Sequence, residues 1–198
     1  NTKNLDEVMG QTGISFIRGS IADADLVEHI MDEYHPEVIV NFAAETHVDR
    51  SIHSSASDFV ETNVRGVQVL LDAARAYKIE KFIQISTDEV YGALLLDARE
   101  RFTEESPFKP NSPYAASKAA GDLLCRSYFV TYGVPTIVTH GANNYGSHQF
   151  PEKMIPYWIL ELLEGRKIPL YGDGLYVRDW IHVSDHVAAI WDIVQKGT

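Results

Sequence analysis

The chain has 198 residues, of which 45% are hydrophobic and 23% are charged, a composition that fits one ordinary folded protein able to bury a core. Its formal net charge of -11 argues against nucleic acid or an anionic membrane as the main partner. The single cysteine, Cys125, excludes an internal disulfide framework and favours a cytoplasmic location, and no apolar run reaches the ~18 residues of a spanning helix.

Short apolar runs and helical patterns alternate through the first part of the chain. Ile14–Ile17 is expected to form a strand, and Asp23 to cap a helix that Pro36 ends. The β-branched run Glu37–Phe42 predicts a buried strand. A loop is expected to follow, from Ala43 to about Ser57.

The same alternation continues through the middle of the chain. Phe59–Tyr77 carries apolar residues at helical spacing, and Lys81–Ser86 predicts a second buried strand. Three prolines make Gly92–Pro113 an irregular loop. A helix over Tyr114–Tyr132 and a strand over Pro135–Thr139 are expected next.

The last part of the chain predicts shorter elements. A helix is expected over Ile155–Glu164, extended segments over Ile168–Tyr171 and Trp180–Val183, and a final helix from about Ser184. Strands that alternate with helices predict an α/β fold, a Rossmann-like doubly wound parallel sheet. Because ligands of such sheets bind beyond the carboxyl ends of the strands, functional residues are expected there.

Tyr114 and Lys118 stand four residues apart on one expected helix and therefore share a face. A nearby ammonium lowers the pKa of a phenol from ~10, which would let Tyr114 act as a base. Taken alone, the pair fits equally well an aromatic residue and a solvated lysine on a surface helix.

A second group of polar residues, Ser86-Thr87-Asp88-Glu89, directly follows an expected buried strand. Two adjacent carboxyl groups in different environments can serve as a general acid and a general base. The Thr87 hydroxyl can orient a substrate oxygen. The alternative interpretation is a polar exit from the strand with two solvated acids.

Together, in this order, the two motifs resemble the extended short-chain dehydrogenases. The Thr87-Asp88-Glu89 triplet narrows the resemblance to dTDP-glucose 4,6-dehydratases of the NAD-dependent epimerase/dehydratase superfamily. Further segments that resemble the family, in its order, are Asn41–Ser51, Thr62-Asn63, Asn143–Gly146, Phe150–Pro156, Pro169–Gly174 and Val177–Trp180.

The resemblance implies NAD as cofactor and conversion of dTDP-glucose to its 4-keto-6-deoxy product. Tyr114, supported by Lys118, would take the proton of the sugar 4-hydroxyl while Thr87 hydrogen-bonds the same oxygen. Glu89 would remove the C5 proton, and Asp88 would protonate the departing 6-hydroxyl. No histidine spacing predicts a metal site, and His47, His140 and His148 are expected in loops or on the surface.

The resemblance also assigns binding residues. The cofactor would contact Ser20, Ile21, Phe42, Ala43, Ala44, Thr46, Thr62, Ser86, Tyr114, Lys118 and Asn144. The nucleotide sugar would contact Thr46, Thr87, Asp88, Glu89, Asn143, Lys153, Met154, Pro169, Tyr171 and Arg178. In the family, helices that match 59–77 and 114–132 pair across a homodimer as a four-helix bundle.

Residues 1–140 are expected to form a partial NAD-binding Rossmann-like domain and 141–198 mostly a small substrate-binding lobe. Whether Trp180–Val183 and the final helix return to the first domain stays open. The family's glycine-rich phosphate-binding turn is absent from the sequence, so the chain is expected to be a piece of a longer protein. Ser20, His140 and Ser147-His148 also depart from the family pattern.

Two alternatives follow. One is an epimerase or decarboxylase of the same fold, against which Asp88 argues. The other is a non-catalytic fragment that only binds nucleotide sugars, for which the absent glycine-rich turn is the best support.

Overall fold

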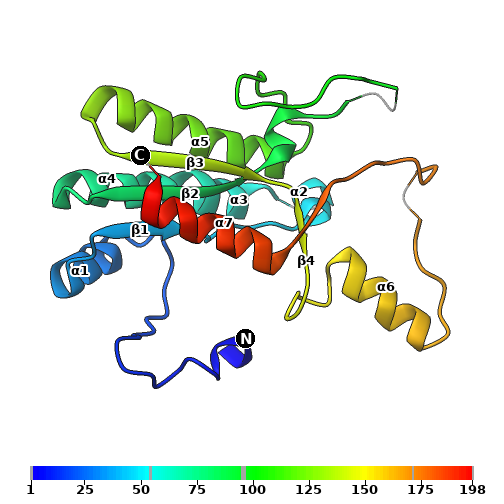
Figure 1. Cartoon of the computed structure of the whole chain (residues 1–198), viewed down its shortest axis with the longest axis horizontal. Coiled ribbons are helices and arrows are strands. Elements are labelled where there is room, and N and C mark those ends of the chain that lie inside the picture. Colours follow the sequence, from blue (N-terminus) through cyan, green and yellow to red (C-terminus); the bar gives the residue numbers. More distant parts are fainter. Residues whose placement is uncertain (1, 54, 95–96, 171, 198) are drawn as a thin grey trace.

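The structure, a computed structural model, describes residues 2–53, 55–94, 97–170 and 172–197 (Figure 1). Short helical turns of 3-10 or π type are labelled η. In chain order, the elements are η1 (Thr2–Leu5), α1 (Ala24–Tyr34), β1 (Val38–Asn41), α2 (Val48–His53), α3 (Ser57–Val60), η2 (Glu61–Gly66), α4 (Val67–Tyr77), β2 (Lys81–Thr87), η3 (Asp88–Tyr91), α5 (Pro113–Tyr132), β3 (Thr136–Gly141), β4 (Asn143–Tyr145), α6 (Met154–Leu163), β5 (Trp180–His182) and α7 (Val183–Lys196).

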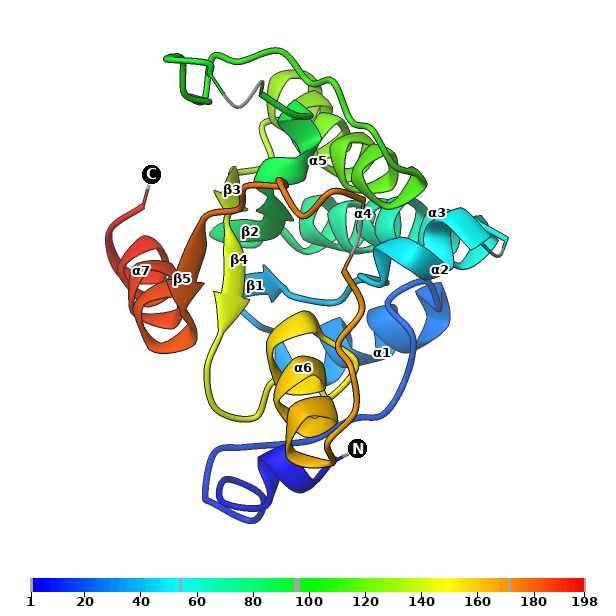
Figure 2. The ribbon, with the colours of Figure 1, turned by 90° about the vertical axis from the view of Figure 1, so that its right-hand side faces the viewer.

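The main sheet has three parallel strands in the order β1-β2-β3. Figure 2 shows α1, α4 and α5 on one side of this sheet and α7 on the other, so the expected Rossmann-like α/β fold is confirmed. Lys81 of β2 donates through Nζ to the Ile193 and Val194 carbonyls of α7, at 3.2 and 2.8 Å. A separate pair of short parallel strands joins β4 to β5.

The core lies between the main sheet and the helices α1, α4 and α5. Phe82 and Leu71 are fully buried there, and Cys125 of α5 packs with them. Burial of a side chain such as Phe82 or Leu71 contributes on the order of 2–3 kcal/mol. This packing fixes β2 against α5, the two elements whose polar residues the sequence analysis selected.

The ends of α1 and α5 follow from identifiable capping residues. Asp23 accepts a hydrogen bond from the backbone of Leu26, as expected, and begins α1. Ser112 accepts one from Ala115 and begins α5, with Pro113 in the first turn. Gly133 ends α5 in the left-handed conformation that glycine adopts readily.

The helix expected over 59–77 is continuous but not regular. Its middle, η2, is a π segment between α3 and α4. Gly121 of α5 lies so close to η2 that an added Cβ would be 2.8 Å from the Asn63 carbonyl oxygen. Such π segments often occur at functional sites, and this one turns Asn63 inward, where it is buried.

Three expectations for local structure were wrong. Ile14–Ile17 is not a strand, because no strand of the described residues pairs with it, and these residues are exposed. The loop expected over 43–57 contains the short helix α2. Ile168–Leu170 forms no strand because no ladder partner lies beside it, while Tyr171 lies outside the described residues.

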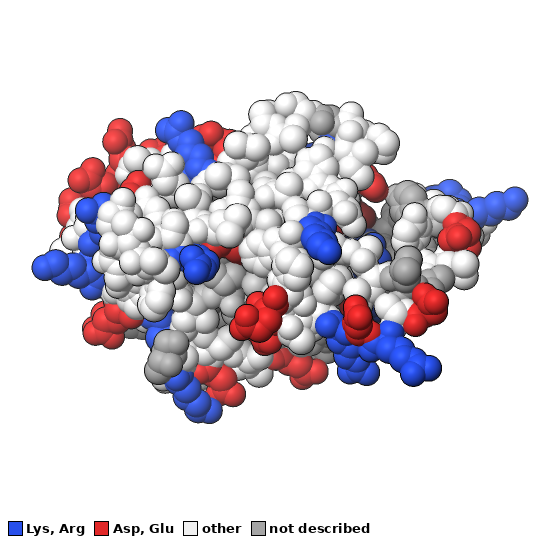
Figure 3. Space-filling model, turned by 90° about the horizontal axis from the view of Figure 1, so that it is seen from above, with Lys and Arg blue, Asp and Glu red and all other residues white. Residues whose placement is uncertain are grey.

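Charges are scattered over the face drawn in Figure 3, where acidic and basic side chains lie among uncharged ones. This face therefore carries no large patch of one sign. Within the described part of the chain, every helix is too short or too polar to cross a membrane.

Candidate active site

The carboxyl end of β2 leads directly into the acidic pair. Thr87, the last residue of the strand, is 9% exposed, and its Oγ1 accepts a hydrogen bond from the Glu89 backbone at 3.2 Å. The same hydroxyl donates to Asp88 Oδ1 at 3.3 Å. Thr87 therefore caps the turn η3 and holds the two acids at the edge of the sheet.

Both acids are partly removed from water. Burial raises the pKa of Asp88, although the Thr87 hydroxyl and the charge of Arg178 act in the opposite direction. Burial also raises the pKa of Glu89, while Arg178 and Lys153 lower it. A carboxyl group with a raised pKa is suited to donating a proton near neutral pH.

Tyr114 lies in the first turn of α5 and is 8% exposed. Its ring packs edge-on against Phe59, with ring centres 6.5 Å apart. Burial and the negative charge of Glu89 raise the pKa of Tyr114, whereas the Thr87 hydroxyl lowers it and Asp88 raises it further. These interactions bring Tyr114, Thr87 and both acids together in one site, as the two motifs predicted.

Lys118, one helical turn after Tyr114, is bound to the backbone of β2. Its Nζ donates to the Ile85 carbonyl at 2.7 Å, and the side chain is 3% exposed. The support of Lys118 for the phenolate stays a prediction, since the acids raise the pKa of Tyr114 here and Lys118 Nζ is bound to β2.

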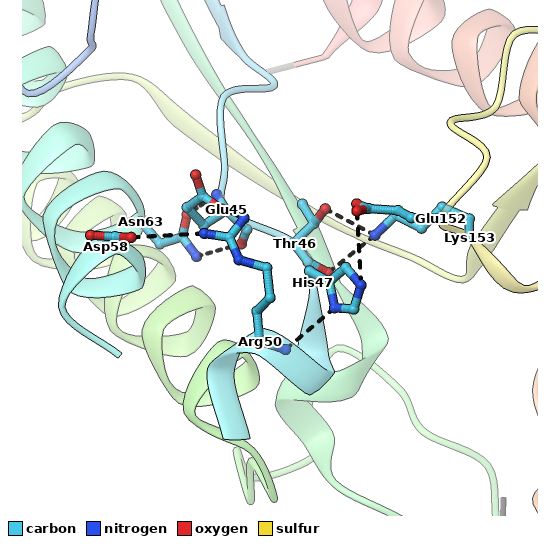
Figure 4. A network of polar contacts seen from close by, with 8 residues as sticks. All are labelled: Glu45, Thr46, His47, Arg50, Asp58, Asn63, Glu152 and Lys153. Atoms are coloured by element: carbon cyan, nitrogen blue, oxygen red, sulfur yellow. Dashed lines mark hydrogen bonds and ion pairs between the residues drawn. The ribbon is translucent and has the colours of Figure 1, made fainter. Parts of the chain in front are cut away.

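The loop after β1 is held by Asn63 of the π segment (Figure 4). Asn63 accepts from the Glu45 backbone N–H at 2.9 Å and donates to the Glu45 carbonyl at 3.0 Å and to Ser117 Oγ at 2.9 Å. Ser117 in turn donates to the Tyr114 carbonyl at 2.7 Å. This chain of bonds fixes the 43–47 loop relative to the start of α5.

The same loop contacts the segment that precedes α6. Lys153 Nζ donates to Thr46 Oγ1 at 3.1 Å and to the Thr46 carbonyl at 3.3 Å, and His47 Nε2 lies 3.8 Å from Glu152 Oε2 (Figure 4). Thr46 and Lys153, two predicted substrate contacts, are therefore adjacent. The Lys153 charge also reaches Glu89, whose pKa it lowers.

The remaining predicted substrate residues come from the second half of the chain. Arg178 is exposed, donates to the Val177 carbonyl at 2.8 Å, and acts on both acids through its charge. Asn143 lies on β4 and is bonded through its backbone N–H to Asp179. Met154 is 39% exposed at the start of α6 and Pro169 is half-buried, whereas Tyr171 lies outside the described residues.

The predicted cofactor residues divide into two groups. Phe42, Ala43 and Ala44 lie just beyond β1, and Phe42 is 58% exposed there. Ser86, Tyr114 and Lys118 lie at the neighbouring edge of β2 and on α5.

Other predicted cofactor residues form internal bonds or packing contacts. Ser20 Oγ accepts from the Ala22 N–H at 3.2 Å, and Ile21 packs against Gly66 of η2. Thr62, on the same segment, is half-buried. Asn144 Oδ1 lies 2.7 Å from His186 Nδ1, a contact with the final helix that the sequence did not indicate.

Two residues of the site were not found by sequence reasoning. Asp122 is 3% exposed and joins Ser86 to His140. His140 lies on β3 with its side chain 17% exposed, so the expectation of a loop or surface histidine was wrong for this residue. The i+4 spacing of Asp122 from Lys118 was the signal available, but helical acids at that spacing are usually solvated.

The model of the family described as GDP-mannose 4,6-dehydratase matches residues 1–198. The dTDP-glucose 4,6-dehydratase of Streptomyces antibioticus is 51% identical over 191 residues, which cover 96% of this chain and 55% of the relative. The low-salt glycan biosynthesis protein Agl12 of Haloferax volcanii is 47% identical over 194 residues, which cover 98% of this chain and 61% of that protein. This chain thus spans little more than half the length of such curated relatives.

A solved structure similar to this chain is that of DesIV, a dTDP-glucose 4,6-dehydratase from Streptomyces venezuelae with NAD and TYD bound. It has a TM-score of 0.94 and 46% identity, and the match covers 100% of this chain and 59% of that one. The family match and these relatives confirm the resemblance based on the two motifs. The chain belongs to the GDP-mannose 4,6-dehydratase family and is homologous to dTDP-glucose 4,6-dehydratases.

Proposed function

We propose that this chain is the part of a dTDP-glucose 4,6-dehydratase that carries its acid–base residues. The observation that carries the proposal is the meeting of Tyr114, Thr87, Asp88 and Glu89 at the end of β2, where the charges of both acids act on the phenol. Two relatives named as dTDP-glucose 4,6-dehydratases, 51% and 49% identical to this chain, support the same assignment. An epimerization needs no elimination of water, so the adjacent acid pair favours the dehydratase.

Thr87 and Tyr114 would bind the oxygen on C4 of the sugar. Tyr114 takes the proton of that hydroxyl as the C4 carbonyl forms, and the Thr87 hydroxyl orients the oxygen. The partly buried Glu89 removes the C5 proton, which the new carbonyl has made acidic. Asp88, whose pKa burial raises, donates a proton from its acid form to the departing 6-hydroxyl, which leaves as water.

NAD is the cofactor that this site fits. When bound, it would supply the acceptor for the hydride from the sugar and the donor for its return. The exposed Phe42 and the small Ala43 and Ala44 leave room beyond β1, while Lys118 offers further N–H donors beside β2. These features lie at the carboxyl edge of the sheet, where dinucleotides bind in this fold.

The second half of the chain would bind the nucleotide diphosphate. Arg178 and Lys153 supply positive charge next to an otherwise acidic site. Arginine pairs well with phosphate oxygens, and lysine can add a point charge. We assign most contacts to the nucleotide diphosphate to 141–198, and the contacts to the reacting sugar atoms and most of the cofactor contacts to 1–140.

We also propose a homodimer in which α5 and the α3–α4 helix pair with those of a second copy. Three apolar side chains of α5, Leu123, Phe129 and Val130, are 56%, 56% and 65% exposed. An isologous contact would remove this apolar area from water. Sedimentation at several protein concentrations tests this part separately from the activity.

The function is tested by incubating the protein with NAD and dTDP-glucose and following the product by mass spectrometry. Loss of one water from the sugar supports the proposal, whereas an isomer of unchanged mass would indicate an epimerase. Neither product, together with no NAD released on denaturation, would indicate a binding fragment. UDP-glucose in parallel tests the preference for the base.

A further inference from the structure

A chain of buried polar groups lies beside the acid–base residues and connects four elements. Ser86 Oγ, on β2, donates to Asp122 Oδ2 of α5 at 2.6 Å. The same carboxylate oxygen lies 3.2 Å from His140 Nε2 on β3. His140 Nδ1 lies 2.9 Å from the Tyr91 hydroxyl on η3. The carboxyl group of Asp122 is thus held from two sides.

The environment of Asp122 is unusual for an acid. Its side chain is 2% exposed, and Oδ1 has no hydrogen-bond partner among the described residues. The rings of Tyr91 and Phe108 pack around His140 on the other side of the contact. A buried carboxylate is unfavourable unless nearby positive charge or hydrogen bonds compensate it, so its presence here calls for a partner charge.

Besides His140, which contacts the Asp122 carboxyl group directly, the buried Lys118 places positive charge near it. It stands one helical turn before Asp122 on the same face of α5, and its Nζ is held at 2.7 Å by the Ile85 carbonyl, next to Ser86. Burial lowers the pKa of Lys118, whereas the Asp122 carboxylate and, to a smaller extent, Cys125 raise it. Burial raises the pKa of the Cys125 thiol to about 12, so this thiol carries no charge near neutral pH.

We propose that Asp122, held in place by Ser86 and His140, is a positioning residue that keeps the buried Lys118 in its ammonium form beside Tyr114. The inference rests on the proposed function, because the charge of Lys118 matters to the reaction only if Tyr114 acts as its base. Tyr114, Lys118 and Asp122 follow one another at successive turns of α5. Asp122 thus acts on the phenol through the lysine and touches no reacting atom.

Several titratable groups surround this cluster and define what a pH experiment reports. They are Asp88, Glu89 and Tyr91 on η3, Tyr114 and Cys125 on α5, and His140 on β3. A measurement at Lys118 itself is therefore needed, since a rate profile alone would combine their titrations.

The direct test is NMR titration of the protein with ¹³C at lysine Cε, the signal of Lys118 being assigned with Lys118→Met. In Asp122→Asn, which keeps the shape and one hydrogen-bonding oxygen, the Lys118 titration midpoint is expected to move to lower pH. Asp192→Asn is the matched control, since it removes an exposed acid of α7 that pairs with Lys196. A Lys118 midpoint equal to that of the unmodified protein in Asp122→Asn overturns the proposal.

Ser86→Ala is the second variant, because Asp122→Asn alone could fail to fold. It removes the hydroxyl that holds the Asp122 carboxylate and stabilises its negative charge. The Lys118 midpoint is therefore expected to move in the same direction, by a smaller amount than in Asp122→Asn. Circular dichroism shows whether each variant is folded. If Asp122→Asn does not fold, an unmoved midpoint in folded Ser86→Ala overturns the proposal.

Kinetics separate this inference from the proposed function. With dTDP-glucose and NAD, Asp122→Asn is expected to lose activity at lower pH on the alkaline side, since the ammonium form of Lys118 disappears earlier, and to lower kcat more than it raises KM. A purely structural role would leave the alkaline limb in place. Absence of dehydration by the unmodified protein refutes the proposed function, while the NMR midpoint still decides the Lys118–Asp122 relation.

Discussion

The helices α5 and α6 both lead to the proposed site, but the fold holds them in different ways. One face of α5 is buried against the sheet and the π segment, and this face includes Tyr114, Lys118 and Asp122. No residue of α6 is buried, although the helix is rich in apolar side chains and Leu163 is 79% exposed. Figure 2 shows α6 standing apart from the layer that contains α4 and α5.

This difference in packing matches a difference in role. Acid–base groups need a fixed position, whereas ligand-binding groups need room for a ligand. Burial is one cause of shifted pKa values, and the packed face of α5 provides it for Tyr114 and Lys118. The second half of the chain acts on the acids through the charges of Lys153 and Arg178, from partly buried or exposed positions. Regions with little buried surface are also those that open and close most easily.

The largest expected effect comes from replacing an acid–base residue that the packed part of the site holds in place. Asp88→Asn cannot supply a proton to the leaving 6-hydroxyl, so the rate of dehydration is expected to fall by about 10²–10⁴-fold. NAD content, measured by absorbance after denaturation, is expected to stay unchanged. The exposed loop variant Asp97→Asn serves as control. Equal losses in rate and in substrate binding would contradict the assigned role.

The next effect compares the packing of the two regions directly. Phe82→Ala, in the fully buried core beneath α5, is expected to lower the free energy of unfolding by about 3–5 kcal/mol. Leu163→Ala, on the exposed face of α6, is expected to change it by no more than about 0.5 kcal/mol. Urea denaturation followed by circular dichroism measures both. Similar losses in the two variants would show that α6 is packed against a surface not described above.

A smaller effect is expected at the start of α5. Ser112→Ala removes the side-chain oxygen that accepts from the Ala115 backbone, so the free energy of unfolding is expected to fall by about 1 kcal/mol. Ser112→Asp keeps an acceptor and is expected to retain most of the stability. Thermal denaturation distinguishes the variants. If Ser112→Asp loses as much as Ser112→Ala, the cap is not the source of the effect.

The smallest effect, a shift in the pH dependence of the rate, is expected from replacing the exposed Arg178, because solvent screens its charge. Arg178 lowers the pKa of both acids, so Arg178→Gln is expected to raise both. Glu89 must be ionised and Asp88 protonated, hence both limbs of the rate profile are expected to move to higher pH. Arg166→Gln, at an exposed arginine paired with Glu161, is the control. A profile that moves to lower pH would contradict the charge assignment.

Much of the fold follows from local patterns that the chain shows directly. Apolar runs predicted β1, β2 and β3 to within one or two residues, and the capping residue Asp23 predicted the start of α1. The run Ile14–Ile17 has the composition of a strand but no strand partner among the described residues, so composition alone misassigned it. Strand formation depends on a neighbour, whereas a helix satisfies its own backbone.

The candidate site, like the fold, has a part that the sequence predicted and a part that it did not. Motif order along the chain was enough to select Thr87, Asp88, Glu89 and Tyr114, because the carboxyl ends of parallel strands meet at one edge of the sheet. The partner of Lys118 was not predictable. Its bond to the Ile85 carbonyl depends on how α5 lies across β2.

The sequence by itself determined which residue types stand at the ends of the strands and on one face of α5, since periodicity and strand order are local properties of the chain. Only the tertiary structure decided which charges oppose one another. Burial and the charge of Glu89 raise the pKa of Tyr114, and the packing of α5 places Asp122 between Ser86 and His140. Electrostatic interactions depend on distance and on exclusion of water, and both are set by contacts between segments far apart in the sequence.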